Sequence, residues 1–298
     1  MINGIINIHK EKGISSAGVV SRLKGILHQK KIGHTGTLDP EAEGVLPVCL
    51  GQATKLTERL ADKTKEYICT CRLGLTTDTE DMCGEVLTRS EVSCETEELC
   101  KVLESFVGDY DQVPPMYSAL KKDGRRLYEL ARQGVVVERP ARRLKIHELE
   151  LLSAELPCFS FRVLCSRGTY VRSLCRDIGE KLGCGGAMES LVRSRSGEFS
   201  LDTALYLSEV EELAASGRLA EHIFSVEHFY EDCPVLKLLP EAERFLQNGN
   251  ALYSHNFQEC PLQPEAGLYR ICDAEGRFSA VYRYEPKQEQ FVPETMYL

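Results

Sequence analysis

Apolar and polar residues alternate along several short segments, a pattern typical of half-buried strands. The clearest alternation occurs at residues 67–73, 144–152 and 159–166. Residues 45–50 are apolar throughout, as in a strand buried on both faces. Residues 4–8 indicate one further strand. The pattern therefore predicts a sheet built from segments that are far apart in the chain.

Apolar residues at helical spacing predict helices between these strands. The first begins at Ser15 or Ser16, whose hydroxyl can cap a helix N-terminus, and runs to about His28. Further helices are expected at residues 54–61, 95–106, 127–132 and 170–182. Because helices and strands follow no regular strand–helix–strand rhythm, an α+β fold is favoured over a doubly wound sheet.

The pattern changes after about residue 235. Short strand-like pieces at residues 268–272 and 278–284 are separated by turns such as residues 273–276. We therefore expect two domains, a larger one at residues 1–234 and a small β-rich one at residues 235–298.

Thirteen cysteines are scattered along the chain, and their odd number leaves at least one unpaired in a monomer. No C-x-x-C occurs, and the histidines fall at no ligand spacing near the cysteines. Reduced thiols used as small apolar side chains are therefore favoured over disulfides or a metal site. No apolar run reaches the roughly 18 residues of a membrane span, and residues 1–12 do not resemble a signal peptide, so we expect a cytoplasmic protein.

The net charge of −9 argues against a nucleic-acid partner, because phosphate binding relies on Lys and Arg. The charges are segregated, however. Residues 119–145 carry nine basic and three acidic side chains, whereas residues 78–111 carry eleven acidic and two basic ones. Residues 1–36 and 162–195 are also basic, and residues 202–298 are acidic. The basic segments either converge into one face or form ordinary solvated surfaces, and both interpretations stay open.

The chemistry is concentrated on the glycine-punctuated segment Gly33 to Pro40 (GHTGTLDP), which precedes the apolar run. Loops held by a sheet commonly carry catalytic groups, and this one offers a carboxylate, an imidazole and two hydroxyls. Taken alone, Asp39 before proline is more often a turn residue whose carboxylate caps backbone amides. Taken alone, His34 is more often an ordinary loop residue.

The complete segment favours a functional role for both residues over an ordinary turn or loop role. GHTGTLDP and GVLPVCLGQATK (44–55) resemble the central motif of the bacterial tRNA pseudouridine synthase B family. Five more segments resemble elements of that family in the same order: NIHKEKGISS (7–16), KEY (65–67), LGLTTDTEDMCG (73–84), PPMYSALKKDGRRLYELAR (114–132) and RGTYVRSL (167–174). The resemblance covers about residues 1–200. Guide-RNA relatives share the Asp loop but lack the PPMYSALK-type segment, so the stand-alone bacterial branch is favoured.

The resemblance implies a mixed, mainly antiparallel sheet of the pseudouridine synthase type, flanked by helices. It also implies isomerisation of the T-loop uridine at tRNA position 55 to pseudouridine. Because nothing is oxidised and no group leaves, no cofactor is expected. Asp39 would be the catalytic carboxylate, acting by addition to the base or sugar or by removing the C2′ proton, and the sequence leaves both routes open. Arg172 would keep that carboxylate ionised; without the resemblance it would be read as a surface helix residue.

The resemblance assigns the uridine pocket as well. Tyr67 would stack on the extruded base, and Tyr170 would be a second pocket tyrosine. His34 would occupy the space that the uridine leaves, and Leu191 would form an apolar wall. Taken alone, Tyr67 is an ordinary strand residue and Leu191 a plain core leucine.

The basic segment at about residues 112–140 would be an insertion that clamps the RNA, or a mobile solvated loop. Its candidates for phosphate contacts are Lys121, Lys122, Arg125 and Arg126. Residues 235–298 occupy the place of the family's PUA-type RNA-binding domain. They are acidic and lack an expected glycine near Phe278, which puts contact with the tRNA acceptor end in doubt.

The partner expected from the resemblance is tRNA, bound at its T-loop and elbow by a monomer that needs no other protein and no membrane. Two alternatives stay open: a pseudouridine synthase of another RNA specificity, such as ribosomal RNA, and a non-catalytic tRNA-folding chaperone.

Overall fold

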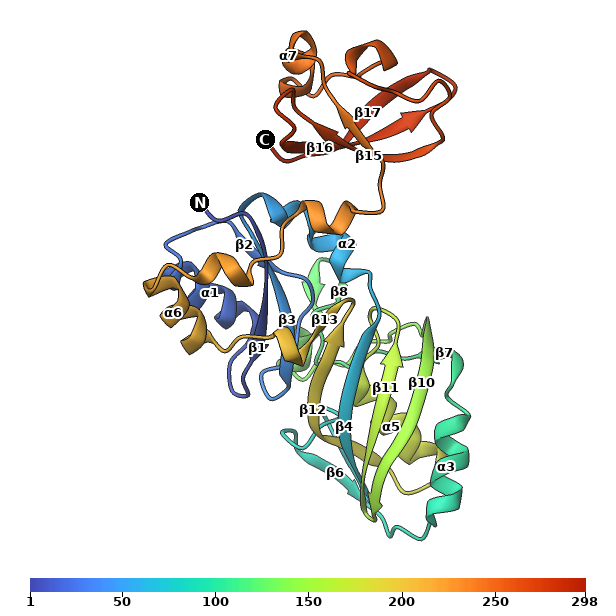
Figure 1. The fold of residues 1–298 in the computed structure, drawn as a ribbon. Helices are drawn as coiled ribbons and strands as arrows, with labels where there is room; N and C mark the ends of the chain where they lie inside the picture. Colours follow the sequence, from blue (N-terminus) through green and yellow to red (C-terminus); the bar gives the residue numbers. More distant parts are fainter.

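A nine-stranded sheet forms the centre of the computed structural model, which describes all 298 residues. Its order is β1-β3-β12-β4-β11-β10-β7, with β2 beside β3 and β13 beside β12 (Figure 1). The strands are β1 (Gly4–Lys10), β2 (Ile32–His34), β3 (Glu43–Leu50), β4 (Lys65–Leu73), β7 (Gly108–Gln112), β10 (Arg142–Glu155), β11 (Cys158–Cys165), β12 (Gly186–Ser196) and β13 (Phe199–Ser200). Only β3 and β12 pair in parallel, so the predicted mixed, mainly antiparallel α+β sheet is confirmed.

Helices cover the sheet in two groups. Side chains of α3 (Thr96–Glu104) and α5 (Val171–Lys181) share one core cluster with β4 and β11, and those of α1 (Ser16–Ile26) and α6 (Leu207–Ala215) share another with β1 and β3. The remaining helices are α2 (Thr57–Ala61), α4 (Leu127–Ala131) and α7 (Glu243–Gln247). None of the helices combines the length and apolar character needed to span a bilayer.

The local chemistry explains the elements that were predicted. Ser15 caps α1, because its Oγ accepts a hydrogen bond from the amide of Gly18 at 3.0 Å. Strand β4 buries every second residue, and β3 is buried almost throughout. Seven of the thirteen cysteines are buried and all are free thiols, which fits their use as small apolar side chains.

The structure corrects several expectations. Residues 33–34 belong to β2 and residues 43–44 to β3, so the loop between them is shorter than predicted. Residues 51–56 form a 3₁₀ helix before α2. The helix predicted at residues 95–106 ends at Glu104 and is followed by β7, a strand that the acidic pattern hid.

A second sheet lies at the C-terminal end, ordered β14-β15-β16-β17 (Figure 1). Its strands are β14 (Val235–Lys237), β15 (Gly267–Cys272), β16 (Phe278–Glu285) and β17 (Gln290–Met296). This sheet has its own apolar core with α7. It also packs on the rest of the chain, since Val281 shares a buried cluster with Ile5 and Val45.

Two small hairpins complete the fold. Strands β5 (Leu75–Thr77) and β6 (Val86–Arg89) pair after β4. Strands β8 (Lys121–Lys122) and β9 (Arg125–Arg126) pair within the basic segment, beside α4.

Candidate active site

Asp39 lies on the short loop between β2 and β3, and contacts on both sides of it hold this loop. The Ser16 hydroxyl accepts a hydrogen bond from the Leu38 amide at 2.8 Å and donates one to the Leu38 carbonyl at 3.1 Å. The fully buried Lys10 ammonium donates to the carbonyl of Ala42 at 2.5 Å. The backbone around Asp39 is therefore anchored to α1 and β1.

The Asp39 carboxylate faces a buried guanidinium. Nε of Arg172 lies 2.9 Å from Oδ2, and Nη2 donates to Oδ1 at 3.1 Å, so the pair is bidentate. The Arg172 side chain is 6% exposed and that of Asp39 is 37% exposed. Arg172 also donates to the carbonyls of Thr79 and Tyr117, at 3.0 and 2.9 Å. The guanidinium is thus held in place while the carboxylate keeps access to solvent.

Opposing effects set the pKa of Asp39. Burial raises this pKa above its ordinary value of 3.8, and the nearby Asp81 carboxylate adds to the rise. The charge and hydrogen bonds of Arg172 oppose it, as does the charge of Lys10. The net direction is upward. The bidentate contact with Arg172 favours the ionised form of Asp39.

Both candidate tyrosines lie close to this pair. Tyr67 on β4 is 9% exposed, and burial raises its pKa while the Arg193 charge opposes the rise and the Asp39 charge adds to it. Tyr170 immediately precedes α5, where its amide donates to the Gln112 side chain at 2.8 Å. Burial raises the pKa of Tyr170 too, and the Asp39 charge contributes. Both phenols are therefore neutral at physiological pH.

His34 and Leu191 lie on β2 and β12, the strands that both pair with β3. His34 ends β2, its Nδ1 is buried without a hydrogen-bond partner, and burial and the charge of Arg193 lower its pKa, so its ring is neutral at pH 7. Leu191 on β12 is 7% exposed and belongs to the same apolar cluster as Tyr67 and Leu38. The structure thus joins Asp39 directly to Arg172, and it places Tyr67 and Leu191 in one apolar cluster with Leu38, the residue before Asp39.

Arg193 is a site residue that the sequence pattern did not single out. It is 2% exposed on β12, and its guanidinium donates to the carbonyls of Val45 at 2.6 Å and Gly36 at 3.2 Å. Gly44 has φ +104°, and a Cβ there would lie 2.3 Å from the Arg193 carbonyl oxygen. Arg193 therefore joins both ends of the Asp39 loop to the centre of the sheet. Gly44 was the one signal in the sequence for this close packing, because its position leaves no room for a side chain.

The predicted phosphate contacts lie on the β8–β9 hairpin. Asp123 and Gly124 form its turn with φ values of +51° and +81°, as expected for an Asp-Gly hairpin turn. The four cations, Lys121, Lys122, Arg125 and Arg126, are all exposed. Behind them Met116, Leu127 and Leu130 form a small buried cluster. The basic segment is therefore a packed unit that presents cations to solvent.

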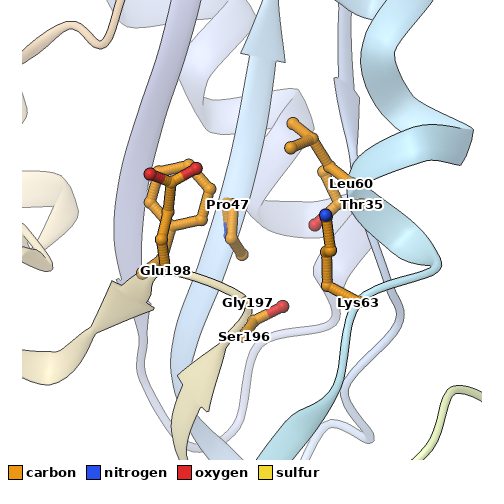
Figure 2. A pocket seen from close by; sticks show the side chains of 8 residues that line it. Thr35, Pro47, Leu60, Lys63, Ser196, Gly197 and Glu198 are labelled. Atoms are coloured by element: carbon orange, nitrogen blue, oxygen red, sulfur yellow. The ribbon is translucent and has the colours of Figure 1, made fainter. Parts of the chain in front are cut away.

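A cavity of about 410 Å³ borders the Asp39 loop through Thr35 (Figure 2). Its lining residues are Thr35, Pro47, Leu60, Lys63, Ser196, Gly197, Glu198 and Phe199. Figure 2 shows Lys63 and Glu198 on opposite sides of it. Asp39, Arg172 and both tyrosines are absent from the lining, so this cavity is distinct from the carboxylate–guanidinium pair.

Comparisons with known proteins identify the class. Residues 24–171 match the model described as TruB family pseudouridylate synthase (N terminal domain). Residues 172–230 match the tRNA pseudouridylate synthase B C-terminal domain. The chain therefore belongs to the tRNA pseudouridine synthase B (TruB) family, whose members are isomerases.

Relatives resemble the chain over its whole length. The tRNA pseudouridine synthase B of Lachnoclostridium phytofermentans is 47% identical over 100% of both chains. That of Bacillus pumilus is 39% identical over 98% of this chain and 96% of the relative. A solved H/ACA RNP bound to a substrate RNA containing 2′-deoxyuridine has a chain with TM-score 0.70 and 26% identity, covering 99% of this chain and 85% of that one. A Cbf5-Nop10-Gar1 complex has a chain with the same TM-score and identity, covering 99% of this chain and 84% of that one.

Proposed function

We propose that this protein isomerises the T-loop uridine at position 55 of tRNA to pseudouridine, with Asp39 as the catalytic carboxylate. The observation that carries the proposal is the bidentate contact between the solvent-accessible Asp39 and the buried Arg172. Relatives that bear the name tRNA pseudouridine synthase B and share 39–47% of their residues with this chain support the substrate.

The reaction breaks the N1–C1′ bond of the nucleotide and forms a C5–C1′ bond. The proton on C5 is lost and N1 gains one, so the atoms balance without an external reactant. Asp39 acts either by adding to the base or sugar or by removing the C2′ proton, and both routes use an ionised carboxylate. Arg172 keeps the carboxylate ionised and directs its oxygens.

The uridine must leave its RNA fold before the carboxylate can reach it. Stacking on an aromatic ring contributes roughly 1–3 kcal/mol per base and offsets this cost. Tyr67 and Tyr170 are neutral phenols beside Asp39, which suits stacking. His34 is a neutral ring with a free Nδ1, which suits a wedge that fills the vacated space better than it suits a cation. Leu191 would wall the pocket.

Binding would come from other parts of the chain. The insertion at about residues 112–140 would clamp the RNA, with Lys121, Lys122, Arg125 and Arg126 on its exposed hairpin contacting phosphates. Residues 235–298 would form a PUA-like domain. The protein would act as a monomer with tRNA as its partner, and sedimentation of the pure protein checks this.

The test is to incubate the purified protein with unmodified tRNA and no added cofactor, and then to map pseudouridine by position. We expect one new pseudouridine, at position 55, with none for Asp39→Asn. The matched control is Asp232→Asn, which changes an exposed aspartate and should convert at the wild-type rate. Modification of a different position would favour another RNA specificity, and mapping in a deletion strain separates tRNA from ribosomal RNA. Wild-type conversion by Asp39→Asn would refute the role of Asp39.

A further inference from the structure

Glu80 has an unusual backbone conformation for its residue type. It lies between β5 and β6 with φ +64°, a region that glycine adopts far more readily, and it is 9% exposed. Its carbonyl accepts from the Met188 amide at 3.0 Å, and its carboxylate accepts from the Ser173 hydroxyl at 2.5 Å. Such a conformation persists only where surrounding contacts determine it, and it is often found next to functional sites.

The two neighbours of Glu80 in the chain are contacts of Arg172. Thr79 accepts a hydrogen bond from Nη1 at its carbonyl, and the Asp81 carboxylate lies 3.7 Å from the same nitrogen. The backbone conformation at Glu80 therefore sets the positions of the Thr79 carbonyl and the Asp81 carboxylate relative to the Arg172 guanidinium, which in turn contacts Asp39.

Arg176 connects this turn to the insertion. It lies one helical turn after Arg172 on α5 and forms an ion pair with the Glu80 carboxylate. Its Nη2 donates to the Val113 carbonyl at 3.2 Å, where the chain leaves β7 and enters the insertion. Arg172 reaches the same segment through the Tyr117 carbonyl. Both arginines therefore tie the Glu80 turn and the base of the insertion to one helix.

We propose that Glu80 and Arg176 are positioning residues for the reaction. Their ion pair fixes the turn around Arg172 and the first residues of the 112–140 insertion together, so the orientation of the Asp39 carboxylate depends on both. Neither residue has a role in the reaction proposed for Asp39. This inference rests on the proposed role of Asp39.

Glu80→Gly separates positioning from stability, because glycine suits the positive φ while the carboxylate is lost. We expect the single-turnover rate constant at saturating tRNA to fall about tenfold, in the range of network effects on coupled sites. The melting temperature and the dissociation constant for tRNA should stay close to wild type. Glu80→Gln keeps the side-chain length, removes the charge and should also slow the reaction. This variant replaces the glycine variant as the test if the glycine variant is poorly folded.

A double-mutant cycle tests the pair itself. If Glu80 and Arg176 act as one unit, Glu80→Gly combined with Arg176→Met should be no slower than the slower single variant. The control is Arg218→Met, which breaks an exposed pair with Glu221 far from Asp39 in sequence and should leave the rate unchanged.

The pH dependence of the rate gives a second measurement, which the loss of a purely structural ion pair would not change. A less well-oriented Arg172 lets the Asp39 pKa rise, so the acidic limb of the rate should shift to higher pH.

The outcomes are distinguishable. If wild type makes no pseudouridine, the proposed function fails and this inference with it. If wild type is active and Asp39→Asn is not, while the Glu80 and Arg176 variants react at the wild-type rate with an unshifted pH profile, only the positioning role is overturned.

Discussion

Two groups of positive charge in this protein differ sharply in their surroundings. Around Asp39, the side chains of Lys10, Arg172 and Arg193 are almost completely buried, and each donates to backbone carbonyls. On the β8–β9 hairpin the four cations are exposed, and they sit on strands of only two residues each. Lysine and arginine are thus buried with fixed partners around Asp39 and exposed to solvent on the hairpin.

The difference separates orientation from attraction. A buried cation with fixed partners cannot rearrange at the moment of reaction and is little screened by salt, so it can orient a reacting carboxylate. An exposed cation contributes salt-dependent affinity for phosphate and little geometric precision. We therefore expect changes in the buried group to alter the rate of reaction, and changes in the hairpin to alter tRNA binding.

The largest effect is expected for Asp39→Asn. Loss of the carboxylate should lower the single-turnover rate by about a thousandfold or more, since residues that carry the chemistry show effects of that size. Binding of tRNA, measured by filter retention, should remain within about threefold of wild type. If tRNA affinity and the single-turnover rate fell by the same factor, the residues around Asp39 would also contribute to tRNA binding.

Two glycines, one in each region, give the next contrast. Gly44→Ala places a Cβ 2.3 Å from the Arg193 carbonyl, so we expect the free energy of unfolding to fall by about 3 kcal/mol or more. Gly124→Ala has nothing within 4 Å and only an unfavourable φ, so about 1 kcal/mol is expected. Urea denaturation of both variants checks this, and equal decreases would contradict the described packing of Arg193 against the loop.

Arg172→Lys tests the bidentate contact. A lysine keeps the charge but has no planar fork, and we expect the rate to fall about thirtyfold. Because the Arg172 guanidinium lowers the pKa of Asp39, weakening the contact raises that pKa. The reaction needs the ionised form of Asp39. As pH is lowered, the variant should therefore lose activity at a higher pH than wild type does. An unshifted acidic limb in the pH–rate profile would show that another group controls it.

The smallest effect is expected for the hairpin. Replacing Lys121, Lys122, Arg125 and Arg126 with glutamine should weaken tRNA binding about tenfold at moderate salt and leave the rate at saturating tRNA unchanged. The slope of log Kd against log salt concentration should fall by about 0.7 for each phosphate that the variant no longer neutralises. An unchanged slope would place the phosphate contacts elsewhere.

The elements that surround the site were predictable to different degrees. The alternation of β4 and the apolar run of β3 predicted the strands beside the Asp39 loop, because one face or both faces of each are buried. Strand β12, which lies between them, was missed. Its register shifts twice in its pairing with β4, and the buried Arg193 puts a charge where the pattern expects an apolar residue.

Long-range partners lie beyond the reach of local patterns. Asp39 and Arg172 are 133 positions apart, and only the family resemblance linked them before the structure. Glu80 and Arg176 had no such link. Glu80 looked like one more charge in an acidic stretch, and its positive φ is visible only in the folded chain. The resemblance thus singled out Asp39 and Arg172, whereas the ion pair of Glu80 and Arg176 became visible only in the structure.

Pseudouridine formation at position 55 releases the hydrogen on C5 of that uridine, so tRNA labelled with tritium at C5 of its uridines reports the reaction directly. We expect one tritium released per tRNA by wild type, and none from a tRNA with cytidine at position 55. Equal release from both tRNAs, or release by Asp39→Asn at the wild-type rate, would contradict this expectation.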